Sequence, residues 1–546
     1  MKGGAVITNI LKAEGTEYVF SFPNNPLIDE AAKTGIRPII GRVERTIINM
    51  ADGYARAANG AKPSVCMVQY GPGIENAYGG IAQAHADSIP LLVLPSGPPR
   101  SRLGLPVRYA PIYNYRGITK WLDSVRDAGR ASAMLRRAFS NLRTGRPAPV
   151  LLEVPSDVVQ DEVPDAAAAY RPVKGSRSSG DPADVRDAVR ALLAAKRPVL
   201  HAGQGVLWAE ASPELLEFAE LVQAPVMTTT LGKSAFPEAH PLALGVGATS
   251  GTGMVNHFLS KADLLFSVGA SLSTTLASCT IPAGKTMIQC TIDERDLNAE
   301  YALDHAVIGD AKLVLRQLID EAKRQLGEGA RPGGREVAAE VASVKKAWLK
   351  EWMPKLTSDE TPLNPYRVFW DMNNTLDRPN SMVTHDSGNV RDQLVPFYEA
   401  TAPRSYLGWG NSTPLGFSLG VTLGAKLARP EKMCVNVLGD TAFGMCGMDF
   451  ETAVRERIPI LTVLINNSAM GGYEKYLAYS AERYRTKFLT GNYLKVAEGL
   501  GYSCERVEQP GEIVPALQRA MQVVKSGHPA LVEFITKEEY DFSKAI

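Results

Sequence analysis

The sequence predicts an α/β protein built from three doubly wound domains, each with a parallel sheet at its centre. Short apolar runs, rich in β-branched residues, have the length of buried strands. Alanine-rich stretches with a helical period, such as 184–195 and 511–524, alternate with them, which implies sheets covered on both faces. The predicted strands include Ser64–Val68, Pro90–Leu94, Val150–Val154, Pro198–Ala202, Pro225–Thr228, Asp263–Val268, Met287–Ile292, Met382–Thr384, Met433–Leu438, Ile458–Ile465 and Ala530–Ile535.

Two breaks in composition divide the chain into three units. The first, Pro164–Pro182, has the alanine, serine and glycine content of a linker. The second, Gly327–Gly334, precedes a predicted charged helix at Arg335–Trp352. A chain of 546 residues is long enough for three or four domains of about 150 residues. We therefore expect α/β domains at residues 1–165, 180–325 and 360–546.

Composition excludes several classes of function. Lysine and arginine number 59 against 58 acids, so the net charge is only +1. The chain therefore lacks the excess positive charge that is typical of proteins binding nucleic acid or an anionic membrane. No apolar run approaches the roughly 18 residues of a transmembrane helix, and the first fifteen residues predict an amphipathic helix rather than a signal peptide. Six dispersed cysteines predict buried thiols in a reducing, cytoplasmic compartment.

Polar residues follow two neighbouring predicted strands of the third unit. Gly439-Asp440 follows one strand, and Asn466-Asn467 follows the next. Because open parallel sheets bind ligands at the carboxyl ends of their strands, we expect Asp440 and Asn467 to lie close together. Oxygen ligands on flexible loops suit Mg²⁺, which completes its shell with phosphate oxygens and water. Each motif alone would be an ordinary turn, but together they favour a metal–phosphate site.

This pair resembles the signature of thiamine-diphosphate (ThDP)-dependent enzymes, a Gly-Asp-Gly motif followed by an Asn-Asn pair. The resemblance implies that Asp440, the side chain of Asn467 and the backbone carbonyl of Ala469 hold Mg²⁺. Thr441 stands where the family has glycine, which changes the turn but leaves an N–H and a hydroxyl for the diphosphate. The loops expected to bind the diphosphate contain Gly439, Asp440, Thr441, Ala442, Asn467, Ala469, Met470 and Gly471.

Two further segments of the third unit extend the resemblance. Leu415 falls at the family position whose apolar side chain lies beneath the cofactor and forces it to bend; the alternative is a core residue. Ser387, Gly388 and Asn389 follow the predicted strand Ser381–His385, where family members bind diphosphate oxygens.

The first unit supplies a candidate catalytic acid. A glutamate in the first turn of a helix is unremarkable, because it complements the helix dipole. Here, however, a strand predicted at Arg37–Val43 leads into Glu44, which opens a run that ends in Asp-Gly-Tyr-Ala-Arg and resembles the family's pyrimidine-binding block. The chemistry requires an acid paired with N1′ of the aminopyrimidine, and the resemblance gives that role to Glu44. The following Gly-Pro-Gly loop, with Gly73 and Asn76, would flank the pyrimidine ring.

The resemblance also bears on assembly and on the middle unit. Family architecture sets the first unit of one subunit against the third unit of another, so we expect a homodimer or a dimer of dimers. In acetolactate synthases the central domain binds FAD, and in oxalyl-CoA decarboxylases it binds ADP. The Gly-x-Gly pairs 245–247 and 251–253 could cradle such a dinucleotide or simply mark turns, so FAD, ADP or neither is expected there.

Two departures concern the substrate. Acetolactate synthases carry Pro-Gly-Gly after the first strand, whereas this chain has Asn24 and Asn25, which are either substrate contacts or parts of a turn. The synthases' Phe-Gln-Glu motif is absent, and residues 106–115 stand in its place. His385 is a candidate proton donor to a carbanion, although a structural strand-end histidine is the simpler interpretation.

Three classes of function remain to be compared. The leading hypothesis is a ThDP- and Mg²⁺-dependent transferase or lyase that resembles acetolactate synthase and acts on a small 2-oxo acid or aldehyde. The alternative within the family is a 2-hydroxyacyl-CoA lyase or oxalyl-CoA decarboxylase acting on an acyl-CoA. A non-catalytic regulatory relative would not need to retain Glu44, Asp440 and Asn467. A dinucleotide-dependent oxidoreductase would need a tight Gly-x-Gly-x-x-Gly after a strand, and none is evident.

Overall fold

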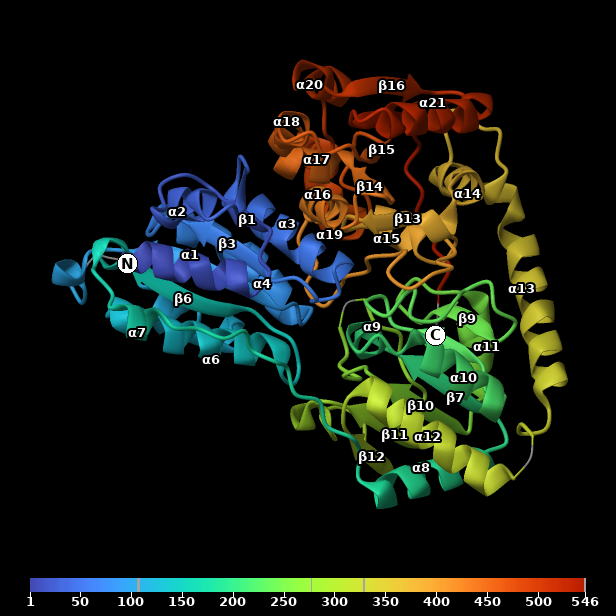
Figure 1. Cartoon of the computed structure of the whole chain (residues 1–546). Coiled ribbons are helices and arrows are strands. Elements are labelled where there is room, and N and C mark those ends of the chain that lie inside the picture. Colours follow the sequence, from blue (N-terminus) through green and yellow to red (C-terminus); the bar gives the residue numbers. More distant parts are fainter. Residues whose placement is uncertain (106–108, 276, 328, 545–546) are drawn as a thin grey trace.

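The computed structural model describes residues 1–105, 109–275, 277–327 and 329–544, and it contains three parallel sheets in three α/β domains (Figure 1). The predicted fold class is therefore confirmed. The three sheets lie within the predicted units 1–165, 180–325 and 360–546, whose exact boundaries stay predictions.

The N-terminal domain has a six-stranded sheet of order β2-β1-β3-β4-β6-β5. Its inner strands β3, β4 and β6 are buried along their whole length, because helices cover both faces. The strands are β1 Tyr18–Ser21, β2 Arg37–Ile40, β3 Ser64–Val68, β4 Leu91–Gly97, β5 Trp121–Ser124 and β6 Val150–Pro155. The helices are α1 Gly3–Ala13, α2 Leu27–Lys33, α3 Glu44–Ala57, α4 Pro72–Ala86, α5 Pro111–Asn114, α6 Ala131–Arg143 and α7 Asp165–Ala168.

The central domain repeats this plan with the order β12-β11-β10-β7-β8-β9. Helices α8 and α12 begin at side-chain caps, Asp181 and Asp310, whose carboxylates accept backbone N–H groups of the first turn. The strands are β7 Pro198–Ala202, β8 Val226–Thr228, β9 Ala243–Val246, β10 Leu264–Val268, β11 Thr286–Thr291 and β12 His305–Ile308. The helices are α8 Pro182–Ala194, α9 Gln204–Trp208, α10 Ser212–Val222, α11 Gly253–Lys261 and α12 Ala311–Leu326.

The C-terminal domain has a five-stranded sheet of order β13-β14-β15-β17-β16, and the long helix α13 joins it to the central domain along the outside (Figure 1). The strands are β13 Ser381–His385, β14 Met433–Gly439, β15 Leu461–Asn466, β16 Ser503–Val507 and β17 Ala530–Ile535. The helices are α13 Gly334–Leu356, α14 Pro365–Thr375, α15 Asn389–Leu394, α16 Ser418–Ala428, α17 Asp440–Cys446, α18 Phe450–Arg455, α19 Glu474–Tyr484, α20 Tyr493–Gly499 and α21 Ile513–Lys525.

Two predicted strands are shorter than expected. The strand predicted at 458–465 begins only at Leu461, because Pro459 has no N–H to donate to a neighbouring strand. The strand predicted at 37–43 ends at Ile40, where the chain turns towards the C-terminal domain and the Arg42 N–H bonds to Asp449. Both corrections concern the ends of strands and leave the topology unchanged.

Helices α3 and α16 join the first domain to the last one by backbone-to-backbone packing. A Cβ on Gly53 of α3 would collide with the Val421 carbonyl of α16, and one on Gly424 would collide with the Met50 carbonyl. Glycine at these positions therefore allows an approach that other residues would prevent. The helices run side by side between the blue and orange domains (Figure 1).

The C-terminal segment crosses back to the central domain, where the described chain ends near β9 and α11 (Figure 1). Ser543 accepts a hydrogen bond from the Gly251 N–H and, through its hydroxyl, one from Trp348 Nε1. Ser250 and Lys544 form an isolated bridge. These contacts tie the last residues of the described chain to the second domain.

Candidate active site

The ends of β14 and β15 bring Asp440 and Asn467 together as predicted. The two strands are parallel neighbours, with Gly439 opposite Ile465. Asp440 opens α17 directly after β14, and Asn467 follows the last residue of β15. The carboxylate and the amide therefore leave the same edge of the C-terminal sheet side by side.

The Asp440 carboxylate is buried, and hydrogen bonds are present at only one of its two oxygens within the described residues. Its Oδ1 accepts the Thr441 N–H at 2.7 Å and lies 3.4 Å from the Thr441 hydroxyl. Its Oδ2 has no hydrogen-bond partner within the described residues, although the side chain is 3% exposed. Burial raises the pKa of Asp440, while N–H groups of Thr441 and Ser468 counteract that shift. A buried oxygen without a partner fits a cation, which would also stabilise the charged carboxylate.

The two residues of the Asn-Asn pair have different surroundings. Asn466 donates to Glu533 at 2.7 Å and accepts the Ser468 N–H at 3.0 Å, so it fixes the loop. Asn467 accepts the Ala469 N–H at 3.1 Å and is half-buried at the edge of the sheet. Ser468 between them adopts a left-handed φ of 55°. The tight turn brings the backbone of Ser468 and Ala469 close to Asp440.

A residue that the motif analysis missed organises the neighbouring loop. Asp386 is fully buried and accepts N–H groups of Ser387, Gly416 and Ser418 at 2.8, 3.0 and 2.9 Å, and the Ser418 hydroxyl at 2.8 Å. It therefore joins the segment 387–389 to the segment that contains Leu415. Its position directly after a predicted strand and before Ser-Gly-Asn was the available signal.

The candidate diphosphate loops converge on one another. Gly388 adopts a φ of +84° at the start of α15, where Asn389 is the first helical residue. Asn389 lies against Gly471, so closely that a Cβ on Gly471 would collide with the Asn389 amide. Met470 donates its N–H to the Lys487 carbonyl at 2.8 Å, which ties this loop to the segment after α19. A Cβ on Gly439 would lie 3.6 Å from Val390 of α15, so the start of α15 lies between Gly439 and the loop with Gly471.

Leu415 is half-buried and packs against the core that the N- and C-terminal domains share. Gly416 after it has a φ of +80°, and the space where its Cβ would be lies 3.0 Å from Met445 and 3.2 Å from Arg45. Partial exposure is compatible with both interpretations of Leu415, as a support for a ligand or as a core residue.

The N-terminal domain brings together the predicted acid and its loop. Glu44 is the first residue of α3, and its side chain is buried. Asn76 on α4 lies 3.4 Å from Glu44 Oε2, with its amide as the donor. A Cβ on Gly73 would lie 3.7 Å from Glu44 Oε1, so the loop passes directly over the carboxylate.

The two asparagines after β1 differ in their surroundings. Asn24 is exposed and has a left-handed φ of 76°. Asn25 is buried, donates to the carbonyls of Val68 and Leu94 at 3.0 and 2.9 Å, and accepts the Leu27 N–H at 3.0 Å. These bonds use both amide hydrogens of Asn25 to join the loop to the ends of β3 and β4. Residues 106–108 of the segment that replaces Phe-Gln-Glu lie outside the described residues.

His385 lies in the core at the end of β13. Its ring stacks on Trp409 at 5.2 Å between centroids and on Tyr406 at 5.8 Å. Nδ1 lies 3.0 Å from the Asp386 carbonyl, and burial lowers the pKa of His385 to about 3. The ring is therefore neutral near pH 7 and holds the strand end in place, which agrees with the simpler interpretation.

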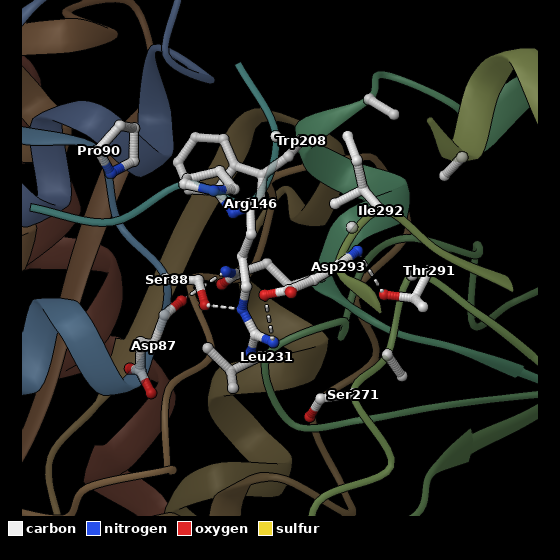
Figure 2. Close-up of a pocket in the computed structure, with 18 of the residues that line it drawn as sticks. Asp87, Ser88, Pro90, Arg146, Trp208, Leu231, Ser271, Thr291, Ile292 and Asp293 are labelled. Carbon is white, nitrogen blue, oxygen red and sulfur yellow. Dashed lines mark hydrogen bonds and ion pairs between the residues drawn. The ribbon is translucent and has the colours of Figure 1, made fainter. Parts of the chain in front are cut away.

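A cavity of about 810 Å³ lies over the carboxyl ends of the central sheet (Figure 2). The segments after β7, β8, β10, β11 and β12 line it, together with Asp87, Ser88 and Arg146 of the N-terminal domain. Of the predicted Gly-x-Gly pairs, Gly247 lines the cavity, whereas Gly245 packs on Thr252 and Gly253 on Trp348.

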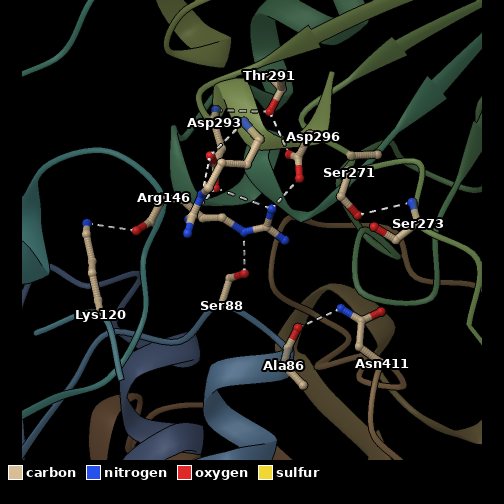
Figure 3. A network of polar contacts seen from close by, with 12 residues as sticks. Ala86, Ser88, Lys120, Arg146, Ser271, Ser273, Thr291, Asp293, Asp296 and Asn411 are labelled. Carbon is tan, nitrogen blue, oxygen red and sulfur yellow. Dashed lines mark hydrogen bonds and ion pairs between the residues drawn. The ribbon is translucent and has the colours of Figure 1, made fainter. Parts of the chain in front are cut away.

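Arg146 connects the two domains across this cavity (Figure 3). Its Nε donates to the Ser88 hydroxyl at 2.8 Å, and its Nη1 to Asp296 at 2.6 Å. Asp293 lies 3.6 Å from the same nitrogen, and Thr291 donates to the other oxygen of Asp296 at 2.9 Å. The arginine was not among the predicted residues, because its acidic partners are about 150 positions away.

Comparisons with known proteins agree with this geometry. Residues 1–125 match the N-terminal TPP binding domain of thiamine pyrophosphate enzymes, residues 185–318 their central domain, and residues 386–534 their C-terminal TPP binding domain. Three parallel-sheet domains of these types define an enzyme that uses thiamine diphosphate. The chain belongs to the thiamine pyrophosphate enzyme family, and the oxidoreductase alternative is thereby set aside.

Several curated relatives cover almost the whole chain. A probable acetolactate synthase large subunit of Methanocaldococcus jannaschii is 30% identical over 98% of this chain and 92% of its own length. Acetolactate synthase isozyme 3 large subunit of Escherichia coli (strain K12) is 27% identical over 98% and 94%. A glyoxylate carboligase of Escherichia coli O157:H7 is 29% identical over 98% and 93%. The predicted resemblance to acetolactate synthases is confirmed. Within the described residues, no helix is both long and apolar enough to cross a membrane.

Proposed function

We propose that the protein is a Mg²⁺- and ThDP-dependent enzyme that forms or cleaves a carbon–carbon bond next to a carbonyl, in the manner of acetolactate synthase. The observation that carries this proposal is the Asp440 carboxylate, buried at the end of β14 with one oxygen unpartnered among the described residues. A cation held there would bind the diphosphate to the loops around it.

The chain offers three oxygen ligands for Mg²⁺ at this edge of the sheet: Asp440, the Asn467 side chain and the Ala469 carbonyl. Thr441 would direct its hydroxyl to the diphosphate or to Asp440, from which it lies 3.4 Å. The backbone and side chains that would hold the diphosphate belong to Ser387, Gly388, Asn389, Gly439, Thr441, Ala442, Met470 and Gly471.

Glu44 would act on the other end of the cofactor. When bound, thiamine diphosphate supplies a nucleophilic carbon and an electron sink for the carbanion that forms beside the carbonyl. Glu44 would hold a proton at its carboxyl group against N1′ of the aminopyrimidine, in the manner of a general acid. Asn76 would orient that carboxyl group, and the absence of a side chain at Gly73 would let the ring approach.

The exposed surfaces around the two half-sites support assembly as a homodimer or dimer of dimers. Val43 and Tyr78 are exposed beside the acid, and Met445 and Met448 are exposed at the end of the helical segment that Asp440 begins. Large apolar side chains at such positions favour burial against a partner. We propose that the first domain of one copy covers the third domain of another.

The substrate class that we propose is a small 2-oxo acid or aldehyde, because the curated relatives are named for acetolactate synthesis and glyoxylate carboligation. Of the two asparagines after β1, Asn24 is the one left to contact substrate, since Asn25 is bonded to the backbone. An acyl-CoA substrate is the outcome that would favour the lyase alternative.

For the central cavity we propose a nucleotide such as FAD or ADP. The cavity lies at the carboxyl ends of the strands, where doubly wound sheets bind nucleotides, and its volume of about 810 Å³ is that of a typical ligand site. The hydroxyls of Ser271 and Thr291 and the guanidinium of Arg146 supply polar partners (Figure 2). Titration with FAD and with ADP would distinguish the two.

Calorimetric titration of the dialysed protein with ThDP, with Mg²⁺ and then with EDTA tests the central proposal. Tight binding that EDTA reverses is expected, followed by turnover in a screen of pyruvate, other 2-oxo acids and 2-hydroxyacyl-CoAs. Absence of binding would overturn the cofactor assignment. Tight binding without turnover of any substrate would favour the regulatory relative instead.

A further inference from the structure

The turn that delivers Glu44 has little local support. Helix α3 begins at Glu44, and Val43 before it provides no side-chain cap. Arg42 and Val43 are exposed. Helix starts of this kind leave N–H groups to be satisfied by other partners, so the place of the Glu44 carboxylate depends on what holds residues 41–43.

The C-terminal domain supplies the holding contact through Asp449. This carboxylate is fully buried, and its Oδ1 accepts the Arg42 N–H at 2.7 Å and the Thr452 hydroxyl at 2.9 Å. Thr46 in the first turn of α3 also faces this carboxylate and, with the Arg42 N–H, counteracts the burial that raises the pKa of Asp449. A Cβ on Gly41 would lie 3.3 Å from Oδ1, so the glycine permits the close approach.

Other contacts between these two segments lie at the surface. Arg37 pairs with Glu456 at 2.9 Å, and Arg42 with Glu451 at 3.8 Å, and in both pairs the arginine side chain is about half exposed. Exposed ion pairs contribute little, whereas a buried hydrogen bond to a carboxylate is costly to remove. The Gly41 N–H also bonds to the Ser21 carbonyl at 3.1 Å within the N-terminal domain, and Asp449 is the buried carboxylate that holds the turn from the C-terminal domain.

We propose that Asp449 is a positioning residue for Glu44. It bonds to the Arg42 N–H on one side of the acid, faces Thr46 on the other, and so holds the carboxylate in place against Asn76. Asp449 lies in the short helical turn that follows α17, whose first residue is Asp440, so the same run of chain carries the proposed metal half-site and contacts the acid half-site. This inference rests on the proposed role of Glu44.

The test compares Asp449→Ala, Asp449→Asn and Thr46→Val with Leu517→Ala, a core truncation on α21 that is remote from the turn. The first readout is amide hydrogen exchange of residues 41–46 in the protein without ThDP. The second is the rate of hydrogen–deuterium exchange at C2 of bound ThDP, measured together with ThDP affinity.

In Asp449→Ala we expect amide protection at residues 41–46 and the rate of C2 exchange both to fall, each by on the order of tenfold. A loss of this size matches the removal of one buried hydrogen bond to a charged group. ThDP affinity should stay near that of the wild type. Asp449→Asn keeps an acceptor for the Arg42 N–H and should restore most of the C2 exchange rate, whereas Leu517→Ala should leave both readouts unchanged.

Wild-type C2 exchange in both Asp449→Ala and Thr46→Val would overturn the inference. If Asp449→Ala does not fold, Thr46→Val decides the question, because it removes the hydroxyl that faces Asp449 and should lower the C2 exchange rate in the same direction. Failure of the wild type to bind ThDP would overturn the proposed function, and the amide exchange would still show whether Asp449 holds the turn.

Discussion

Glu44 and Asp440 are buried acids that the fold assigns to different partners. Glu44 has an amide donor, Asn76, and a glycine loop over it, whereas one oxygen of Asp440 has no hydrogen-bond partner in the part of the chain that the structure describes. The first environment suits a group that exchanges a proton, and the second suits a charged metal ligand. Substitutions at the two residues should therefore have different effects.

Glu44→Gln should lower turnover by roughly a hundredfold or more, the usual range for a missing acid–base group, because the amide cannot hold the proton at N1′. ThDP should still bind, since the diphosphate loops are in another domain. Steady-state kinetics and calorimetry check both points, with Glu30→Gln on α2 as the control. Unchanged turnover would remove Glu44 from its proposed role.

Asp440→Asn should weaken Mg²⁺-dependent ThDP binding by at least the roughly 10–100-fold seen when outer-shell partners of a metal are lost. The amide keeps the size of the side chain but lacks the charge that holds the cation. Calorimetry with and without EDTA measures the effect. Asp359→Asn, an exposed acid of the same domain, is the control, and equal affinity in both variants would refute the ligand assignment.

His385→Phe should make the protein less sensitive to acid. The unfolded chain protonates His385 below about pH 6.5, but the folded protein resists until about pH 3. The wild type therefore loses stability as pH falls through this window, by about 1.4 kcal/mol per pH unit from this group. Phenylalanine can still stack on Trp409 and Tyr406 but does not titrate. The thermal midpoint of His385→Phe should therefore fall less between about pH 6.5 and about pH 4 than that of the wild type. A variant at the exposed His528 is the control and should behave like the wild type. Parallel curves would contradict this.

The sequence revealed Asp440, Asn467 and Glu44 because each stands directly after an apolar run within a local motif. Asp386 also follows a predicted strand, but the segment singled out there begins at Ser387, and Asp449 stands in none of the predicted motifs. Asp386 accepts hydrogen bonds from Gly416 and Ser418, about 30 residues away along the chain. Asp449 accepts one from Arg42, 407 residues away. Residues whose role depends on distant contacts are visible only once the fold is known.

At the scale of elements, edge strands were the hardest to predict. The predicted runs at 64–68 and 198–202 coincide with β3 and β7. Strands β5, β9, β12 and β16 were not among the predicted strands, and each lies at the edge of its sheet. Edge strands bury fewer residues, as the exposed positions of β12 and β16 show, so their sequences lack a continuous apolar run.

Gly424→Ala should weaken the α3–α16 pair. The added methyl would meet the Met50 carbonyl of the other helix, and backbone cannot move aside as a flexible side chain can. We expect a loss of about 1–3 kcal/mol, typical of overpacking, measured as a lower thermal midpoint. Gly499→Ala on α20, where a Cβ meets open space, is the matched control and should be neutral or stabilising. Equal midpoints would show that the helices can separate without cost.

At the scale of the whole molecule, mixing two inactive variants in one dimer tests the proposed shared site. If each site combines Glu44 of one copy with Asp440 of another, co-expressed Glu44→Gln and Asp440→Asn chains should regain activity. Random pairing makes half of the dimers hybrid, each with one intact site, so about a quarter of wild-type activity is expected. Each variant expressed alone is the control. No recovery in mixed dimers would show that each chain forms its own site.

The α3–α16 pair also has a consequence for synthesis on the ribosome. The two helices are separated by roughly 360 residues, so the face of α3 that carries Gly53 stays uncovered until α16 has emerged. At about 5–20 residues per second this delay lasts some tens of seconds. Throughout that time the first domain exposes a face adapted to bind another helix closely. Chains that stall before residue 428 should therefore be the species that chaperones retain and that aggregate when chaperones are scarce.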